Sequence, residues 1–233
     1  MSAACIEALG DSALLIRFGE RIDAQTNVLA LAAAELLVHA DLPGLLDVAP
    51  AYATVCVRYD PLAWEDAGLS PFSALRARLA TLLEILDGIP SLQVPGPLEI
   101  PVCYGGVYGP DLAELARHGR LTVDEAIALH CAGDYRVAML GFAPGFPYLL
   151  GLDPRLHMRR HANPRTRVPA GSVAIGGAQT GIYPRATPGG WRVIGRTPLV
   201  LFDSARLPPA LLAPGQRVRF RAIDADELAE HPL

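Results

Sequence analysis

Lysine is absent from this sequence, because all 20 of its basic residues are arginine. Lysine contacts the β- and γ-phosphates in a P-loop, forms Schiff bases and carries biotin. Its absence therefore excludes a P-loop nucleotide site, a Schiff-base enzyme and a biotin carrier in this chain. Positive charge comes instead from guanidinium groups, which suit bidentate contacts with carboxylates and phosphates.

Cysteines are few and widely spaced. The four include no C-x-x-C pair, so a zinc site or a disulfide framework is not expected, and we predict no metal site. We interpret them as small buried hydrophobic residues. They are Cys5, Cys56, Cys103 and Cys131.

No apolar run approaches the roughly 20 residues that cross a bilayer. The longest, from Val28 to Ala40, contains Glu35 and His39. Residues 1–20 lack a basic start followed by a long apolar block. We therefore predict a cytoplasmic protein without membrane contact. Hydrophobic residues are 51% of the chain and charged residues 19%, which is more apolar and less charged than the average soluble domain and predicts a chain that folds.

Charge is unevenly distributed along the chain. The formal net charge is −4, but residues 1–100 contain five arginines against 13 acids, and residues 101–233 contain 15 against 11. The basic second part favours a small carboxylate- or phosphate-bearing substrate, or an acidic partner surface. Nucleic acid is not expected, because aromatic residues are only 6% and no zinc-finger, RRM or KH signature is present.

Residues 1–88 predict a small α+β domain with the order ββαββα. Gly10-Asp11 between alternating segments indicates a hairpin, and Asp23 and Ser70 are typical helix N-caps. The expected strands are Ile6–Leu9, Ala13–Phe18, Leu45–Val48 and Tyr52–Tyr59, and the expected helices run from Asp23 to before Pro43 and from Ser70 to about Leu86.

Residues 89–97 are a predicted linker, because closely spaced prolines and glycines break regular structure there. Residues 98–233 are predicted to form a second, mainly β domain. Thr122 and Glu125 have the spacing of a capping box, and short β runs separated by glycine and proline indicate a barrel. The expected elements are a strand at 98–103, helices at 110–118 and 122–131, and β runs at 137–140, 173–175, 191–195, 199–202 and 217–222.

Three blocks of this second domain are unusually rich in glycine and proline. They are Gly141–Leu149, Pro164–Pro184 and Thr187–Pro198. The first block predicts a stiff, exposed loop that displays Phe142, Phe146 and Tyr148. Turn formation alone would explain any one block, but three together favour a shared functional surface.

The three blocks and five shorter motifs resemble the KipI/allophanate hydrolase subunit 1 family. The shorter motifs are Ile100-Pro-Val-Cys-Tyr-Gly-Gly106, Tyr108-Gly-Pro-Asp-Leu112, Ile127-Ala-Leu-His130, Tyr135-Arg-Val137 and Pro214-Gly-Gln-Arg-Val-Arg-Phe220. The resemblance spans nearly the whole second domain and implies a cyclophilin-like β-barrel there. The first domain resembles the family mainly in element order and length.

The resemblance also implies a function. It points to one subunit of an ATP-dependent 5-oxoprolinase, which hydrolyses 5-oxo-L-proline to L-glutamate. The implied partners are a KipA-type protein and a LamB/YcsF-type protein, with ATP and Mg²⁺ acting at the level of the complex. Because this chain has no nucleotide motif, we expect it to be inactive alone.

Three alternatives remain open. One is a KipI-type inhibitor of a sensor histidine kinase, and another is a carboxyltransferase-type module of a urea carboxylase or allophanate system. The third, peptidyl-prolyl isomerase activity, follows only from analogy with the implied barrel.

His130, Arg165 and Tyr183 are the candidate catalytic residues. His130 is a candidate acid or base in a pocket, although it would also suit a helix cap or a space-filling role. Arg165 precedes the Val168–Ser172 turn, which would hold its guanidinium rigidly against a carboxylate or phosphate. An internal ion pair is the equal alternative for Arg165.

Other residues are candidates for binding. Arg167, Ser172, Gln179 and Thr180 would contact a substrate or anion, or fill ordinary turn roles. Ser172 lacks a G-x-S-x-G elbow, so we do not expect a nucleophile. The residues predicted to line a pocket or partner surface at the mouth of the barrel are Phe142, Pro144, Gly145, Phe146, Tyr148 and Trp191.

Overall fold

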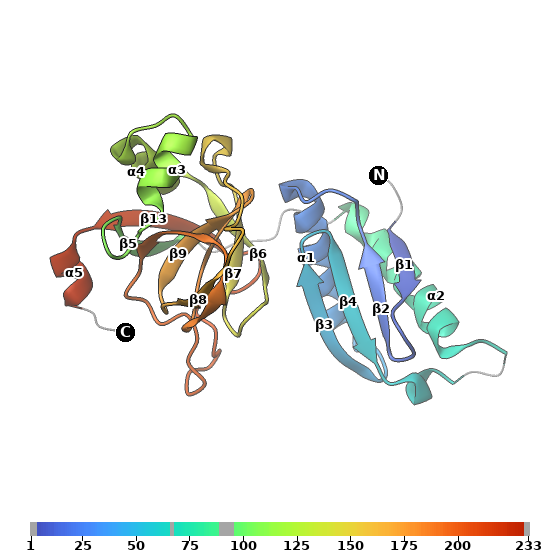
Figure 1. Ribbon diagram of the computed structural model, residues 1–233. Helices are drawn as coiled ribbons and strands as arrows, with labels where there is room; N and C mark the ends of the chain where they lie inside the picture. The colour runs from blue at the N-terminus through green and yellow to red at the C-terminus, as the bar shows by residue number, and fades with distance from the viewer. Residues whose placement is uncertain (1–3, 66–67, 89–95, 231–233) are drawn as a thin grey trace. The chain divides into compact units, whose positions relative to one another are not determined.

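The structure, a computed structural model, describes residues 4–65, 68–88 and 96–230. The chain divides into two compact units, Met1–Gln93 and Val94–Leu233. Figure 1 shows an open sheet in the first unit and a barrel in the second. Most of the predicted linker, residues 89–95, lies outside the described residues. Among the described helices, none has both the length and the apolar character that crossing a bilayer requires.

The first unit contains an antiparallel sheet with the strand order β1-β2-β4-β3. Its strands are β1 (Cys5–Ala8), β2 (Ala13–Arg17), β3 (Leu45–Ala51) and β4 (Thr54–Tyr59). Its helices are α1 (Ala24–His39), the 3-10 helix η1 (Pro61–Trp64), α2 (Pro71–Leu83) and the 3-10 helix η2 (Glu84–Gly88).

Side-chain caps start both α-helices of this unit. The Asp23 carboxylate accepts the Thr26 N–H at 2.9 Å, and the Ser70 hydroxyl accepts the Ser73 N–H at 3.2 Å. These bonds satisfy amide groups that have no partner inside the helix. α1 packs against β3 and β4. Alternate strand residues and the helices together form a core that includes Leu14, Ile16, Leu37, Val55, Val57 and Leu79.

The second unit contains a closed barrel with the strand order β10-β7-β6-β13-β5-β12-β9. Its strands are β5 (Leu98–Tyr104), β6 (Tyr135–Leu140), β7 (Pro147–Leu150), β9 (Ser172–Gly176), β10 (Gln179–Ile182), β12 (Arg192–Arg196) and β13 (Arg217–Ile223). A separate ribbon pairs β8 (Arg165–Val168) with β11 (Thr187–Gly189). The prediction of a barrel is confirmed, and its cyclophilin-like type stays a prediction.

A parallel strand pair helps close the barrel. β13 runs parallel to β5, from Val218 opposite Leu98 to Ile223 opposite Cys103, and antiparallel to β6. The other neighbours in the barrel are antiparallel. Fully buried side chains from these strands form the core, including Ile100, Val102, Val137, Leu149, Val173, Ile175, Ile194 and Val218.

Helices α3 (Leu112–His118) and α4 (Val123–Ala132) pack against each other, with α3 on β12 and α4 on β13. The predicted capping box starts α4. The Glu125 N–H donates to the Thr122 hydroxyl at 3.2 Å, and the Thr122 N–H donates to the Glu125 carboxylate at 2.7 Å. The remaining short helices are the 3-10 helix η3 (Pro154–Leu156) and α5 (Ala225–Ala229).

The predicted strand at 199–202 is wrong. No named barrel strand contains these residues. The carbonyls of Val200 and Leu201 instead accept hydrogen bonds from the Arg206 guanidinium at 3.4 Å, and the Leu201 carbonyl also accepts the Leu211 N–H at 2.8 Å. The Arg206 side chain and an isolated bridge between Phe202 and Ala210 thus satisfy this segment in place of a regular strand pairing.

The cysteines are free thiols, but they are not uniformly buried. Cys103 is buried as predicted, Cys56 and Cys131 are half-buried, and Cys5 is exposed. The interpretation of Cys5 as a core residue is therefore wrong, because β1 is an edge strand of its sheet.

Candidate functional site

A bidentate ion pair lies at the centre of the candidate site. Asp111, just before α3, is only 5% exposed, and Arg165 begins β8. The two terminal nitrogens of Arg165 donate to the two carboxylate oxygens of Asp111, Nη2 to Oδ1 at 2.7 Å and Nη1 to Oδ2 at 2.8 Å. Of the two roles considered for Arg165, the structure shows the internal ion pair, whose planar geometry fixes the guanidinium.

Two further groups contact Asp111. The Val193 N–H donates to Oδ2 at 2.7 Å, and Nε2 of His161 lies 3.2 Å from Oδ2 and 2.9 Å from Nη1 of Arg165. Burial raises the pKa of the Asp111 carboxyl, but these hydrogen bonds together bring it below its ordinary 3.8. One ionised carboxylate therefore joins segments that are far apart in the sequence.

Five aromatic side chains from the glycine- and proline-rich blocks pack together. They are Phe142, Phe146, Tyr148, Tyr183 and Trp191. The Phe146 ring is central, with its centroid 5.2 Å from that of Tyr183 and 5.5 Å from that of Trp191, at interplanar angles of 89° and 90°. Such edge-to-face contacts are favourable between aromatic rings. The Arg160 guanidinium lies 5.5 Å from the Trp191 centroid, in a cation–π arrangement.

The β8–β11 ribbon brings Arg165 to this aromatic cluster. Gly189 of β11 is the register partner of Arg165, and the Tyr183 hydroxyl lies where a side chain at Gly189 would begin. Burial raises the pKa of Tyr183, although the nearby positive charges of Arg160 and Arg165 act in the opposite direction. Arg165 and Tyr183 thus lie in one cluster, and their catalytic role stays a prediction.

The first block is only partly the exposed loop that we predicted. Phe142 is 62% exposed, but Phe146 is 1% exposed and residues 147–150 form β7. The prediction that Phe146 is displayed at the surface is wrong, because its ring fills the space between Tyr183 and Trp191. Phe142 is the exposed aromatic residue of this block.

The other predicted surface residues vary in exposure. Pro144 is exposed, Tyr148 is half-buried and Gly145 is buried. Gly145 has a φ of 78°, a conformation that favours glycine. Trp191 is 5% exposed and lies directly over Gly176, where its ring leaves no room for a side chain.

His130 occupies a different environment. It is 1% exposed, and its ring stacks on Phe220 with centroids 4.4 Å apart. Burial lowers the pKa of His130 from 6.5 to about 3. Among the described residues, its ring has no contact with Arg165 or Tyr183. The structure therefore separates the third predicted catalytic residue from the other two and shows the space-filling role.

The hydrogen bonds of His130 determine its tautomer. Thr180 donates its hydroxyl proton to the Ala174 carbonyl at 3.1 Å, so it accepts a proton from His130 Nε2, also at 3.1 Å. Nδ1 of His130 then accepts the Tyr104 hydroxyl proton at 2.7 Å. A neutral imidazole satisfies every member of this buried chain, which a protonated one would not.

The four predicted binding residues are not equivalent. Ser172 and Thr180 are 2% and 0% exposed, and Thr180 belongs to the His130 hydrogen-bond chain. Gln179 is half-buried at the start of β10, whereas Arg167 is exposed on β8. Only Gln179 and Arg167 are thus accessible to a ligand in this structure.

Asp111 is the residue that sequence reasoning missed. It lies in the Tyr108–Leu112 motif, but its partner Arg165 is 54 residues away, so no local spacing links them. Arg160 and His161 appear in the sequence as part of a basic loop, and the structure gives them separate partners, Trp191 and Asp111.

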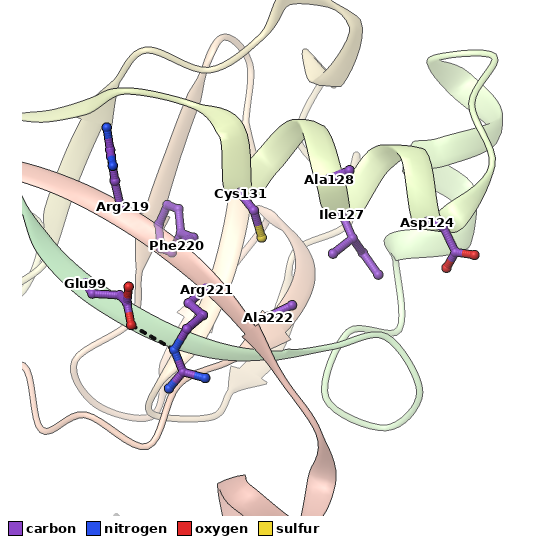
Figure 2. A pocket seen from close by; sticks show the side chains of 9 residues that line it. All are labelled: Glu99, Asp124, Ile127, Ala128, Cys131, Arg219, Phe220, Arg221 and Ala222. Carbon is purple, nitrogen blue, oxygen red and sulfur yellow. Dashed lines mark hydrogen bonds and ion pairs between the residues drawn. The ribbon is translucent and has the colours of Figure 1, made fainter.

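A hollow of about 460 Å³ lies elsewhere on the second unit, between α4, β5 and β13 (Figure 2). Ile127 and Cys131 of α4 face it from one side, and Arg221 pairs with Glu99 at 2.8 Å on the other. None of the predicted site residues is among its described lining residues. In the described part of the chain, no group of three or more His, Cys, Asp or Glu side chains could hold a metal ion.

Comparison with known proteins shows the relationships of this chain. It matches the family described as carboxyltransferase domain, subdomain C and D, over residues 4–212. The B subunit of the 5-oxoprolinase of Bacillus subtilis (strain 168) is 45% identical over 223 residues, which cover 92% of this chain and 91% of that protein.

Two solved structures have the same fold. The crystal structure of TTHA0988 is 42% identical with a TM-score of 0.76, and the match covers 91% of this chain but only 40% of that one. The Kluyveromyces lactis urea carboxylase has a TM-score of 0.74 at 20% identity, covering 97% of this chain and 22% of that one, which supports the fold alone.

These matches confirm the resemblance found in the sequence. The family match covers most of the chain, and the Bacillus subtilis relative is similar along nearly its whole length. The chain therefore belongs to the family of carboxyltransferase domains, subdomain C and D, in which its relatives include the B subunit of 5-oxoprolinase.

Proposed function

We propose that this chain is one subunit of an ATP-dependent 5-oxoprolinase. The observation that carries the proposal is the 45% identity to the B subunit of the Bacillus subtilis 5-oxoprolinase, over 92% of this chain. The reaction opens the five-membered ring of 5-oxo-L-proline to give L-glutamate.

The chemistry explains why ATP is needed. A lactam amide is a poor electrophile, and transfer of the γ-phosphoryl group of ATP to its oxygen activates the carbonyl carbon and releases ADP. Water then attacks that carbon and the C–N bond breaks, which leaves the former carbonyl carbon as an acyl phosphate. A second water hydrolyses the acyl phosphate to the side-chain carboxylate and free phosphate. The ring nitrogen becomes the amino group of glutamate. Positively charged groups stabilise the phosphorylated intermediate and bind the substrate carboxylate.

The Arg165 cluster can supply an oriented guanidinium, and Arg160 over the Trp191 ring adds positive charge beside it. Asp111 fixes the guanidinium, yet 32% of the Arg165 side chain stays exposed. A fixed and partly exposed guanidinium is suited to orient a substrate carboxylate.

We assign the substrate side to Arg165 and the exposed Phe142 ring. Tyr183 is 2% exposed and supports the Phe142 ring from within the cluster, and His130 has a structural role.

The complete reaction requires the KipA-type and LamB/YcsF-type partners, and ATP and Mg²⁺ act in the assembled cytoplasmic complex. The exposed Phe142 ring and Pro144 offer an apolar contact for one partner. In this proposal the partner completes a pocket at the cyclophilin-like barrel, over the aromatic cluster.

Reconstitution tests the proposal. The purified chain alone should form no glutamate from 5-oxo-L-proline. With both partners, ATP and Mg²⁺, the mixture should release glutamate and ADP in equal amounts, and omission of any one protein should stop the reaction. A complete mixture that is inert towards 5-oxo-L-proline, while this chain inhibits a sensor histidine kinase, would favour the KipI-type alternative.

Carboxyl transfer is the second candidate, because the matching family is described as a carboxyltransferase domain. This chain has no lysine, so another protein would have to carry the biotin. The assay supplies a biotin carboxylase, a biotin carrier and labelled bicarbonate, and measures label in urea. Carboxylated urea without 5-oxoprolinase activity would replace the first proposal.

A further inference from the structure

A second hollow of the barrel unit, with a volume of about 430 Å³, is lined by basic side chains. We call it the basic hollow. Its described lining includes two arginines and two histidines but no acid: His118, His157, Arg159 and Arg192. These residues come from three places in the fold, since His118 ends α3, Arg192 begins β12 and the other two follow η3. Their convergence places two guanidinium groups and two imidazoles around one small volume.

Part of the wall of the basic hollow is main chain. Gly177 and Ala178 form the bend between β9 and β10, and a Cβ built on Gly177 would meet nothing within 4 Å. Two backbone hydrogen bonds of 2.8 Å and 3.1 Å join Gly177 to Met158, next to Arg159. The bend is therefore fixed, and its small side chains leave the space of the basic hollow open.

Two hydrogen bonds hold the Arg192 guanidinium in place without using all of its donor nitrogens. Its Nε donates to the Arg159 carbonyl at 3.1 Å, and its Nη1 donates to Glu114 at 2.7 Å. Among the described residues, its Nη2 has no hydrogen-bond partner. The Arg192 side chain is 13% exposed and its charge is offset by Glu114, so its contribution to a ligand is the hydrogen bond that Nη2 can donate.

The basic hollow is distinct from the aromatic cluster. Arg159 lines the hollow, whereas the next residue, Arg160, lies over Trp191. The two neighbouring arginines thus lie at different sites, the basic hollow and the aromatic cluster. Because they carry the same charge on the same segment, Arg160 is a matched control for Arg159.

We propose that the basic hollow binds a phosphate group, either as free inorganic phosphate or as the terminal phosphate of a nucleoside diphosphate. A tetrahedral dianion can accept hydrogen bonds from several directions, as this arrangement of guanidinium and imidazole groups requires. The volume accommodates a phosphate together with part of an attached molecule. The inference does not depend on 5-oxoprolinase activity, because it concerns binding by the chain alone.

Isothermal titration calorimetry of the full chain tests the proposal, with sodium phosphate and ADP as probes and chloride used to hold ionic strength constant. Arg159→Gln should raise the Kd for the bound probe at least about tenfold, because one charge-assisted contact is lost. Arg160→Gln should leave the Kd within about twofold. Glu114→Gln should lower the Kd about threefold, because it removes the negative charge that offsets Arg192 while its amide oxygen can still accept from Nη1.

The outcomes separate the sources of the ligand. Tighter binding of ADP assigns the hollow to a nucleotide, and tighter binding of phosphate assigns it to the free ion. Equal weakening by Arg159→Gln and Arg160→Gln would show general charge attraction and overturn the proposal. Absence of binding by either probe, or binding of glutamate alone, would also overturn it. Failure of the reconstituted 5-oxoprolinase would leave this result unaffected.

Discussion

The burial of His130 makes the stability of the protein depend on pH. Its pKa is lowered from 6.5 to about 3 by burial, so between these pH values the unfolded chain binds a proton that the folded chain does not. The free energy of unfolding therefore falls as the pH falls through this range, by up to about 1.4 kcal/mol per pH unit. His130→Gln should remove this slope between pH 6.5 and pH 4, measured by urea denaturation.

Tyr104→Phe is the matched control. It removes the hydroxyl that donates to Nδ1 of His130 but keeps the imidazole, so the acid slope should persist while stability falls at every pH. If the slope were unchanged in His130→Gln, some other group would account for it.

The Asp111–Arg165 pair contributes to stability as well as to the proposed site. Arg165→Gln leaves a buried carboxylate with fewer partners, and we expect the free energy of unfolding to fall by about 2 kcal/mol, less than for a fully buried pair because Arg165 is partly exposed. The double variant Asp111→Asn with Arg165→Gln should lose less than the sum of the single losses. Additive losses in chemical denaturation would show that the two side chains do not interact.

At the level of single elements, the capping box of α4 is a testable unit. Thr122→Ala removes the hydroxyl that accepts the Glu125 N–H, and should lower the free energy of unfolding by about 1 kcal/mol. Thr122→Ser keeps the acceptor and should restore most of the loss in the same denaturation experiment. A Thr122→Ser variant as unstable as Thr122→Ala would assign the effect to the methyl group instead.

Helix starts could be predicted from the sequence because a cap is a local signal. Asp23, Ser70 and Thr122 each accept the backbone N–H three residues later. The sequence did not predict β7, β8, β10 or β11 as strands, because each has only three or four residues and all except β8 contain proline or glycine. Such segments become strands through pairing with neighbours, which no local pattern reveals.

The same limit applies to the candidate site. Proline and glycine spacing marks the blocks that meet in the aromatic cluster, but it does not distinguish the buried Phe146 from the exposed Phe142. The sequence also does not identify Asp111 as a site residue, because its partners are distant along the chain. Its role depends on Arg165 and on the Val193 N–H, which lie 54 and 82 residues away.

In the assembled complex, alanine substitutions at Phe142 and Phe146 should change different properties of the protein. Phe142→Ala should leave the melting temperature nearly unchanged but weaken binding to a partner protein by about 2 kcal/mol, if the exposed ring anchors the interface. Phe146→Ala should destabilise the fold by about 3–5 kcal/mol through loss of a buried ring. Sedimentation with the partner and thermal melting measure the two effects. Unchanged partner affinity in Phe142→Ala would place the interface elsewhere.

The parallel pairing of β13 with β5 also bears on how the protein is made. Arg221 pairs with Glu99, which the ribosome adds to the chain 122 residues earlier, an interval on the order of ten seconds. Until β13 leaves the exit tunnel, β5 has one open edge and the barrel cannot close. The sheet of the first unit needs no later segment. A premature stop before β13 would therefore yield a finished first unit joined to a permanently open sheet, whose free edge favours aggregation.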